Sequence, residues 1–475
     1  MIWEVLAAVV VLAFVGAGAL STLWGRADLL LLQAIVALAL GGFNVYALGT
    51  VWYPIKVVSS WALVLVLLRL LMNRHPERLS AGFAIWFLLA CWVVVAGLFG
   101  FVVDAPLPDD LGSGLLSAAL RPIVQTYTYL SLLALTPLAL MGLRTEADHR
   151  RFWSFYAITA TASCAVALVQ WAMLRAGLAF MPILRMHGEH SQAAAFDGGE
   201  SVVYRLYGFA GEPKALAVLL VPIAFAALMA TLQPRQVRPW WGHPAMPVAF
   251  ALVTILTYST AALIALAVGA LLTIVLTPWA GARGGRVVAV VFTATLGASA
   301  LMVLVAVYDV HVQVLDLIHL RTVERLETQI FERRETAALA YLFEERPELA
   351  LNGLGLGMFI YHFPGLLWGE GTDVIQSGWV TSLVDLGLLG TALVLALCAS
   401  AVLDGASAAA RLAPSQRIFL AGAMGALVGC SAMHLGWNVF GLLTLFVGVL
   451  RASTGLRPAA SLIPGASLIN ARVSG

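Results

Sequence analysis

Residues 333–400 read RRETAALAYLFEERPELALNGLGLGMFIYHFPGLLWGEGTDVIQSGWVTSLVDLGLLGTALVLALCAS. The stretch opens with charged residues, passes through a glycine-rich turn and a polar run, and ends in an apolar segment that begins at Trp379. An apolar segment of this length is typical of a transmembrane helix. The polar part is an exception in a hydrophobic chain, so we expect the chemistry of this protein to lie in its polar loops.

The composition of the whole chain indicates the same class of protein. Of its 475 residues 61% are hydrophobic and 11% are charged, and the mean hydropathy is +0.93. Soluble domains carry about 25% charged residues. The composition therefore predicts an all-α, polytopic membrane bundle. The net charge of only +2 gives no basic surface for nucleic acid, so no nucleic-acid partner is expected.

Apolar runs of span length predict about 12 or 13 transmembrane helices. The runs lie at roughly 2–20, 29–48, 55–72, 83–103, 115–141, 152–174, 214–232, 247–258, 260–278, 287–307, 378–400 and 418–450. The last run is long enough for two short helices with a break near His434. The run 247–278 is too long for one span, and Tyr258-Ser259-Thr260 is its natural reversal.

Arginine-rich loops predict the orientation, because short loops of this kind stay in the cytoplasm. They lie at 72–78, 143–151, 233–238, 281–286 and 409–417. The intervening loops then lie outside, the N-terminus is external, and Arg451 and Arg457 favour a cytoplasmic C-terminus.

This orientation divides the chain into six segments. They are N-terminal transmembrane helices (1–174), a first long outer loop (175–213), central transmembrane helices (214–307), a large outer loop (308–377), C-terminal transmembrane helices (378–450) and a cytoplasmic tail (451–475). Within the large loop, apolar residues recur at three- to four-residue steps with Arg and Glu between them. This spacing predicts an amphipathic helix or helix pair over 319–345.

One candidate site lies where the first long loop enters a span, in RLYGFAGEPK (205–214). Pro213 suits the first turn of a helix, whose N–H groups and positive dipole end favour an anion. Arg205 and Lys214 add two positive charges there. The alternative is that Lys214 extends to the membrane interface and Arg205 pairs with Glu212.

The large outer loop contains a second group of cations. It consists of Arg321, Arg325, Arg333 and Arg334. Guanidinium groups bind phosphate or pyrophosphate through paired hydrogen bonds. The alternative is a surface neutralised by neighbouring glutamates. The glycines of 352–357 are not a dinucleotide fingerprint, because no strand precedes them; they predict a tight turn that returns the chain to the membrane.

Two further polar residues are candidates for a cavity. His434 is ionisable inside an apolar run and is therefore a site hypothesis; a packing hydrogen bond to Asn438 is the alternative. Arg121 stands at the outer end of the run 115–141. The outer-loop histidines have no metal-ligand spacing, so no metal is expected.

Taken together, four segments resemble the O-antigen polymerase and O-antigen ligase superfamily, bacterial membrane glycosyltransferases with a GT-C-like fold. The segments are RLYGFAGEPKALAVLLVPIAFAAL (205–228), LTYSTAALIALAVGALL (256–272), RRETAALAYLFEERPELALNGLGLGMF (333–359) and IQSGWVTSLVDLGLLG (375–390). The chain departs from the family pattern in two places. Thr260 stands where Arg is frequent, and Gln376-Ser377 stands where His-Asn is common. Glu212-Pro213 is more similar to polymerases than to ligases.

The resemblance implies a metal-independent, inverting transfer of a glycan from undecaprenyl pyrophosphate to a lipid-linked acceptor. The transfer would take place on the periplasmic face of the bacterial inner membrane, without a cofactor. The implied roles are general base for Glu212, His362 or Glu370, pyrophosphate contact for Arg205, Lys214, Arg333 and Arg334, and cavity lining for Arg121, Arg321, Arg325, Gln376 and His434. Membrane lipid and a chain-length regulator protein are the implied further partners.

Three other functions remain open at this point. An O-antigen ligase would use the same site with lipid A-core as the acceptor. A secondary transporter or lipid flippase would place charged or broken helices in the membrane interior, often with an internal repeat. A membrane anchor for a partner complex would need neither a catalytic site nor charged groups in the membrane interior. The concentration of charge in the outer loops favours the polysaccharide polymerase.

Overall fold

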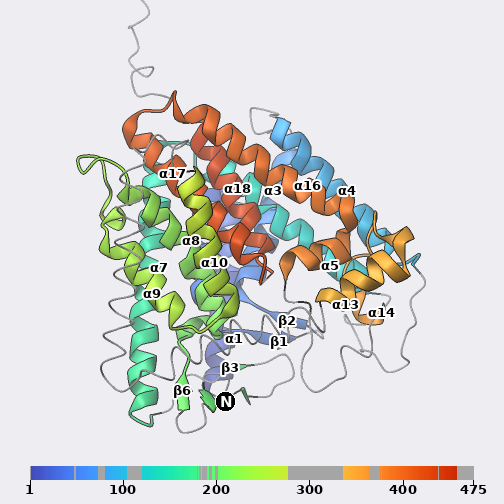
Figure 1. Ribbon diagram of the computed structural model, residues 1–475, viewed down its shortest axis with the longest axis horizontal. Coiled ribbons are helices and arrows are strands. Elements are labelled where there is room, and N and C mark those ends of the chain that lie inside the picture. Colours follow the sequence, from blue (N-terminus) through green and yellow to red (C-terminus); the bar gives the residue numbers. More distant parts are fainter. Residues whose placement is uncertain are drawn as a thin grey trace, which may run out of the picture.

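The computed structural model describes residues 2–47, 50–72, 81–103, 120–178, 180, 183–184, 190–191, 195–197, 202–276, 335–362, 375, 377–436 and 438–456. The main helices are α1 (Ile2–Leu23), α2 (Ala27–Ala39), α3 (Pro54–Leu71), α4 (Ala81–Phe99), α5 (Arg121–Leu133), α6 (Leu135–Gly142), α7 (Glu146–Arg175), α8 (Pro213–Thr231), α9 (Ala245–Ile255), α10 (Thr260–Leu276), α16 (Gly378–Ala409), α17 (Pro414–Met433) and α18 (Phe440–Thr454). The predicted all-α membrane bundle is confirmed (Figure 1).

Short elements decorate the loops of this bundle. The strands β1 (Val45–Ala47) with β2 (Thr50–Trp52), β3 (Ile183–Leu184) with β4 (His190–Ser191), and β5 (Ala195–Asp197) with β6 (Val202–Tyr204) form three antiparallel hairpins. The short helices are η2 (Gly208–Ala210), η3 (Trp240–Gly242), α13 (Glu335–Ala340), the π-helical turn η6 (Tyr341–Glu345), η7 (Pro347–Leu349) and α14 (Phe359–His362).

Within the described residues, eight helices are long and apolar enough to cross a membrane. They are α1, α3, α4, the α5–α6 pair, α7, α8, α16 and α17, and four shorter apolar helices (α2, α9, α10 and α18) accompany them. The chain is therefore a multi-pass membrane protein. The predicted reversal at Tyr258-Ser259-Thr260 is confirmed, because α9 ends at Ile255 and α10 begins at Thr260. The predicted span 287–307 lies outside the described residues.

The predicted span 29–48 is wrong in its second half. Helix α2 ends at Ala39, and the β1–β2 hairpin follows. Gly42 explains the change, because its N–H donates to the Phe209 carbonyl at 2.9 Å. A Cβ on Gly42 would lie 2.7 Å from the Gly211 Cα, so only glycine lets these two backbone segments meet.

Helices α8 and α17 form the centre of the bundle, with nearly nine-tenths of each span buried. Glycines on α17 allow the close approach. A Cβ on Gly425 would lie 2.7 Å from the Phe225 carbonyl oxygen of α8, and one on Gly429 would lie 2.6 Å from the Phe225 ring. Small residues commonly allow membrane helices to pack in this way.

Helix α16 was predicted as one uninterrupted span over 378–400, and the structure corrects this. It extends to Ala409 and is broken at Gly387, which has φ +68°. Chain from the glycine-rich loop replaces the lost helical bonds. The Leu388 and Leu389 N–H groups donate to the carbonyls of Ala350 and Leu351, and the Leu354 N–H donates to the Val384 carbonyl. Non-helical backbone at membrane depth needs such partners.

The bundle has two chemically different ends. At one, called here the arginine end, Asp28 forms ion pairs with Arg26 and Arg151, and Arg69 donates to the Gly25 carbonyl. At the other, called the loop end, lie the β1–β2 hairpin, η2 and the first residues of α8 and α16. Figure 1 shows the N-terminus at this second end, near β3 and β6.

Candidate functional site

The segment 205–214 is held against the α9–α10 turn by Arg205. This side chain is 8% exposed, and it donates from Nε to the Thr257 carbonyl at 2.9 Å and from Nη2 to the Tyr258 carbonyl at 3.4 Å. Two segments that resemble one family's motifs are therefore in direct contact. Arg205 also organises the backbone, so its pyrophosphate role remains a prediction.

Gln170 of α7, which the sequence did not single out, fixes the same segment from the other side. Its side-chain nitrogen donates to the Arg205 carbonyl, and its side-chain oxygen accepts from the N–H groups of Tyr207 and Gly208. The side chain is fully buried. The available signal was a glutamine that interrupts the apolar run 164–174 of α7.

Glu212 and Lys214 lie at the start of α8, and both are half-buried. Glu212 is the residue before the first helical turn, with extended backbone and no side-chain cap. Tyr53, which precedes α3, lies close enough to Glu212 to interact with the charge of its carboxylate. Burial and the nearby Glu212 together raise the pKa of Tyr53 to about 12, so the phenol keeps its hydrogen and can donate it.

His434 joins the α17–α18 turn to the start of α16. Its Nδ1 accepts from the Val439 N–H at 3.1 Å, so the neutral ring carries its hydrogen on Nε2. Its carbonyl accepts from the N–H groups of Gly378 and Trp379. The ring partner is Val439 rather than the side chain of Asn438, whose oxygen accepts from the Phe440 N–H. The packing alternative therefore has support, with a different partner.

A chain of contacts links segments 205–214 and 335–390 at the loop end. A Cβ on Gly436 would lie 2.8 Å from Ala261, near the start of α10. On the other side of His434, the Ser377 N–H donates to the Glu335 carboxylate of α13 at 3.3 Å. Segments 205–214 and 335–390, far apart in sequence, are therefore connected through 257–261 and 434–436.

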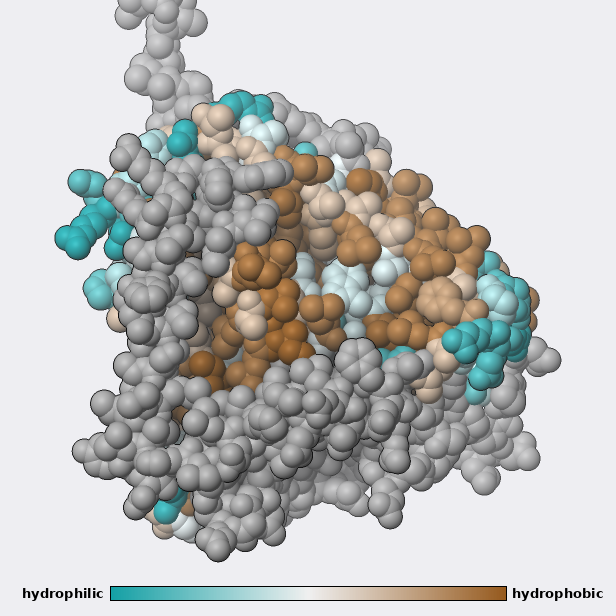
Figure 2. Space-filling model, viewed as in Figure 1, coloured by the Kyte–Doolittle hydropathy of each residue, from teal (hydrophilic) through white to brown (hydrophobic). Residues whose placement is uncertain are grey.

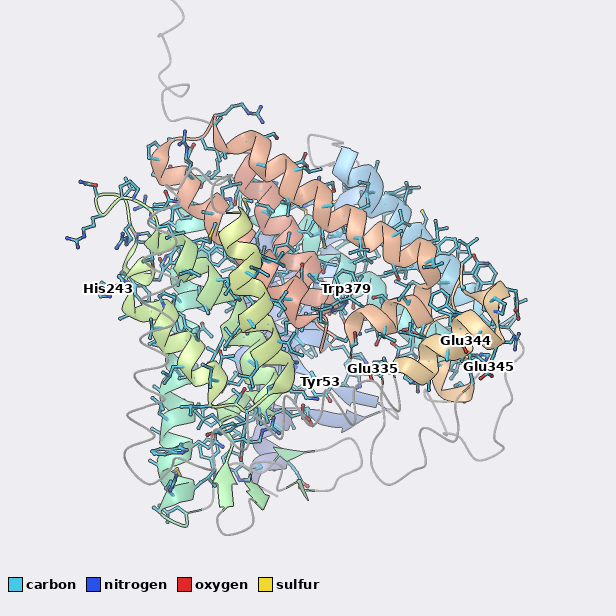
Figure 3. The ribbon with its side chains drawn as sticks, in the orientation of Figure 1. Tyr53, His243, Glu335, Glu344, Glu345 and Trp379 are labelled. Atoms are coloured by element: carbon cyan, nitrogen blue, oxygen red, sulfur yellow. The ribbon has the colours of Figure 1, made fainter. Side chains whose placement is uncertain are left out.

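This region is hollowed on the face seen in Figure 2. The residues at the floor of the hollow are pale, that is near-neutral to weakly hydrophilic, and hydrophobic residues form the walls along α10 and α16. Figure 3 places Trp379 at the hollow, with Glu335 below it. The arrangement combines a less apolar floor with apolar walls in a membrane protein, so an amphipathic ligand suits it.

A second polar cluster lies where the glycine-rich loop meets the broken helix. Arg121 donates from Nε to the Gly357 carbonyl at 2.6 Å. The Gly357 N–H donates to Oδ1 of Asp385 at 3.1 Å, and the Tyr129 hydroxyl donates to Oδ2 at 3.0 Å. Asp385 is 4% exposed, and its carboxylate is therefore buried but hydrogen-bonded on both oxygens.

The sequence interpretation missed Asp385. The residue lies within the apolar run SLVDLGLLG, and an acid inside a span was the signal that could have identified it. Its two partners come from α5 and from the loop near α14, which are distant in sequence. Only the tertiary structure therefore shows which groups donate hydrogen bonds to the Asp385 carboxylate.

His362, a predicted base, is 5% exposed and lies beside Tyr341, with 3.0 Å between its Nδ1 and the Tyr341 hydroxyl. Burial, and then the positive charge of Arg346, lowers the pKa of His362 to about 4, so the ring is neutral near pH 7. Its Nε2 is buried without a hydrogen-bond partner among the described residues. A base role needs the tautomer in which Nδ1 donates to Tyr341 and Nε2 offers a lone pair.

The remaining predicted site residues lie outside the described residues. They are Glu370, Arg321, Arg325, Arg333, Arg334 and Gln376. Most of the amphipathic helix predicted over 319–345 lies there too. From Glu335 onward the structure has the short helix α13 and the π-helical turn η6.

Comparisons of this chain with protein-family models, with curated proteins and with solved structures found no match.

Proposed function

We propose that this protein is a polysaccharide polymerase of the bacterial inner membrane. It transfers a glycan from undecaprenyl pyrophosphate to a sugar hydroxyl of a lipid-linked acceptor on the periplasmic face. The observation that carries the proposal is the chain of contacts from Arg205 through His434 to Glu335. It joins segments 205–214, 257–261 and 335–390 at one end of the bundle, and each includes a part that resembles the glycosyltransferase superfamily.

The shape of the loop end supports a lipid-linked substrate. A polyprenyl tail needs an apolar groove between helices, and the hollow between α10 and α16 has such walls (Figure 2). A glycan and its pyrophosphate need polar groups, and the floor of the hollow is less apolar than its walls. The apolar walls therefore suit the polyprenyl tail, and the adjacent floor suits the glycan and its pyrophosphate.

The proposed reaction is a single displacement. The acceptor hydroxyl attacks the anomeric carbon of the donor glycan as the bond from that carbon to the pyrophosphate oxygen breaks. Undecaprenyl pyrophosphate leaves with the electron pair of that bond. A base accepts the hydroxyl proton; Glu212, His362 and Glu370 remain the candidates. Positive charge near the leaving group stabilises the transition state. Lys214, half-buried at the start of α8, is one described cation for that role.

One observation favours a transporter or lipid flippase as a second candidate. Helix α16 is broken within its span and carries a buried acid, Asp385, next to the break. Transporters often bind substrates at discontinuous helices of this kind. Here the break is filled by the glycine-rich loop, and both carboxylate oxygens accept hydrogen bonds within the protein. A structural use of this break is therefore sufficient.

Purified protein supplied with an undecaprenyl-pyrophosphate oligosaccharide tests the proposal directly. A ladder of longer lipid-linked products is expected. Transfer only onto lipid A-core would instead identify a ligase, and substrate movement across vesicles without transfer would identify a transporter. Both outcomes would overturn the polymerase.

The same assay tests individual residues. We expect Glu212→Gln and Lys214→Gln to slow product formation by at least roughly tenfold, since each removes a charge proposed to act in the transition state. Arg235→Gln is the control, because Arg235 is exposed in the loop after α8, at the arginine end of the bundle. Normal rates in both site variants would remove the start of α8 from the active site.

A further inference from the structure

We propose that Arg121 is a preformed binding site for the phosphate or pyrophosphate group of a lipid. The proposal deepens the function proposed above and rests on it for the choice of a pyrophosphate lipid. It stands on the geometry of the cluster formed by Arg121, Tyr129, Gly357 and Asp385, which was not among the predicted pyrophosphate contacts.

The first step is that the guanidinium of Arg121 is fixed in place. Its Nε donates to the Gly357 carbonyl at 2.6 Å, which orients the plane of the group. Gly357 has φ +70°, and a Cβ there would lie 3.2 Å from the Arg121 Nε and 2.6 Å from Gln125. Glycine is therefore required for the loop backbone to approach this arginine.

The second step is that the carbonyl is itself held rigidly. Asp385 on α16 accepts from the Gly357 N–H, and Tyr129 on α5 donates to the same carboxylate. Arg121 and Tyr129 are both on α5. The loop, the broken helix and α5 therefore form one hydrogen-bonded unit, and the arginine pays little ordering cost on binding.

The third step is that the terminal amino groups of Arg121 have no hydrogen-bond partner among the described residues, although the nearby Asp385 carboxylate acts on the charge of the guanidinium. Within the described part of the chain no ion pair joins Arg121 to a carboxylate, and Asp385 uses its two oxygens for Gly357 and Tyr129. The only hydrogen bond found for Arg121 in that part is the one from Nε, and the side chain is half-buried rather than enclosed. Its two terminal amino groups can therefore bind two oxygens of one phosphate group.

The test measures binding of defined lipids to the full-length protein in neutral phosphatidylcholine nanodiscs. The probes are geranylgeranyl pyrophosphate, geranylgeranyl phosphate and phosphatidylglycerol. We expect Arg121→Gln to weaken binding of the pyrophosphate lipid by roughly 10- to 100-fold, as expected for loss of a charged hydrogen-bonding pair. Arg121→Lys should give an intermediate loss, because ammonium keeps the charge without the planar fork.

Controls separate folding from binding. Arg235→Gln removes an exposed arginine in the loop after α8, at the arginine end, and should leave the affinity unchanged. Wild-type affinity in an Arg121→Gln protein that keeps its melting temperature would overturn the proposal. If the Arg121→Gln protein does not fold, the Arg121→Lys protein is measured instead. The proposal is overturned if Arg121→Lys binds both the phosphate and the pyrophosphate lipid with the affinity of the wild type.

The outcomes also separate this proposal from the proposed function. Binding of the pyrophosphate lipid that depends on Arg121, without any product ladder from the wild type, would support the anion site and reject the polymerase. A ladder of wild-type yield from Arg121→Gln, with unchanged affinity, would reject the anion site alone. Equal, Arg121-dependent binding of phosphatidylglycerol would support the site and assign it to membrane lipid headgroups.

Discussion

At the scale of single residues, glycines determine where two backbone segments can pack in direct contact. Gly353 has φ +82° and Gly387 has φ +68°, a region that side chains other than glycine rarely adopt. A Cβ on Gly353 would lie 2.6 Å from the backbone nitrogen of Gly387. The sequence indicated a tight turn over 352–357, but the partner of that turn is the broken helix, which no local pattern specifies.

His362 makes the stability of the protein sensitive to acid. Burial lowers its folded pKa to about 4, against 6.5 in the unfolded chain. As the pH falls through this window the unfolded chain binds a proton that the folded protein does not, so stability is lost. We expect the melting temperature in detergent to fall between pH 7 and pH 4.5 by more in the wild type than in His362→Gln.

The control for this measurement is His243→Gln. His243 is exposed beside η3 and is labelled at the left of Figure 3, so its removal should leave the acid-induced loss unchanged. An equal loss in wild type and His362→Gln would show that His362 does not contribute to it.

At the scale of elements, the broken helix α16 is the joint between the glycine-rich loop and the bundle. The Trp92 side chain of α4 donates to the Leu386 carbonyl beside the break at 2.8 Å. Asp385 adds two hydrogen bonds, one to the loop and one to α5. Three elements therefore depend on one interrupted turn of helix.

This arrangement predicts that Tyr129 and Asp385 act as a coupled pair. Tyr129→Phe leaves one oxygen of the buried Asp385 without a partner, which typically costs about 1–3 kcal/mol. Asp385→Asn should also destabilise the protein, and the double variant should lose less than the sum of the two single losses. Reversible unfolding in mixed detergent micelles measures all four proteins of this cycle.

Tyr127→Phe is the matched control, because Tyr127 lies on the same helix with 37% of its surface exposed. Its effect should be within about 0.5 kcal/mol of zero, as is usual for surface substitutions. Strictly additive losses in the Tyr129–Asp385 cycle would contradict the coupling.

At the scale of the whole molecule, the two ends of the bundle differ in charge. The ion pairs of Asp28 with Arg26 and Arg151, and of Asp404 with Arg451, lie at the arginine end. The loop end carries the hollow and the segments proposed to bind substrate. Positive charge favours the cytoplasmic side, so we expect the loop end, with the proposed site, to face outward.

The orientation predicts which positions a membrane-impermeant maleimide reaches from outside. In a Cys91→Ser background, Leu178→Cys and Glu345→Cys at the loop end should react in spheroplasts. Arg150→Cys, exposed at the arginine end, should react only after the membrane is disrupted. Labelling of Arg150→Cys in intact spheroplasts would reverse the orientation and contradict a periplasmic site.

The sequence by itself determined the helical membrane class, most span positions and the reversal at Tyr258-Ser259-Thr260. These follow from hydropathy and charge, which are local properties of the chain. It also singled out His434, because a polar group in an apolar run is visible locally, and Arg205, because a positive charge stands there just before the start of a helix.

Only the tertiary structure decided what those residues contact. The end of α2 at Ala39 depends on Gly42 meeting Gly211, and the break in α16 depends on the glycine-rich loop. The structural role of Asp385 depends on its hydrogen bonds with Gly357 and Tyr129. The physical reason is the same in each case. A buried polar or backbone group must find a hydrogen-bond partner, and here that partner lies far away in the sequence.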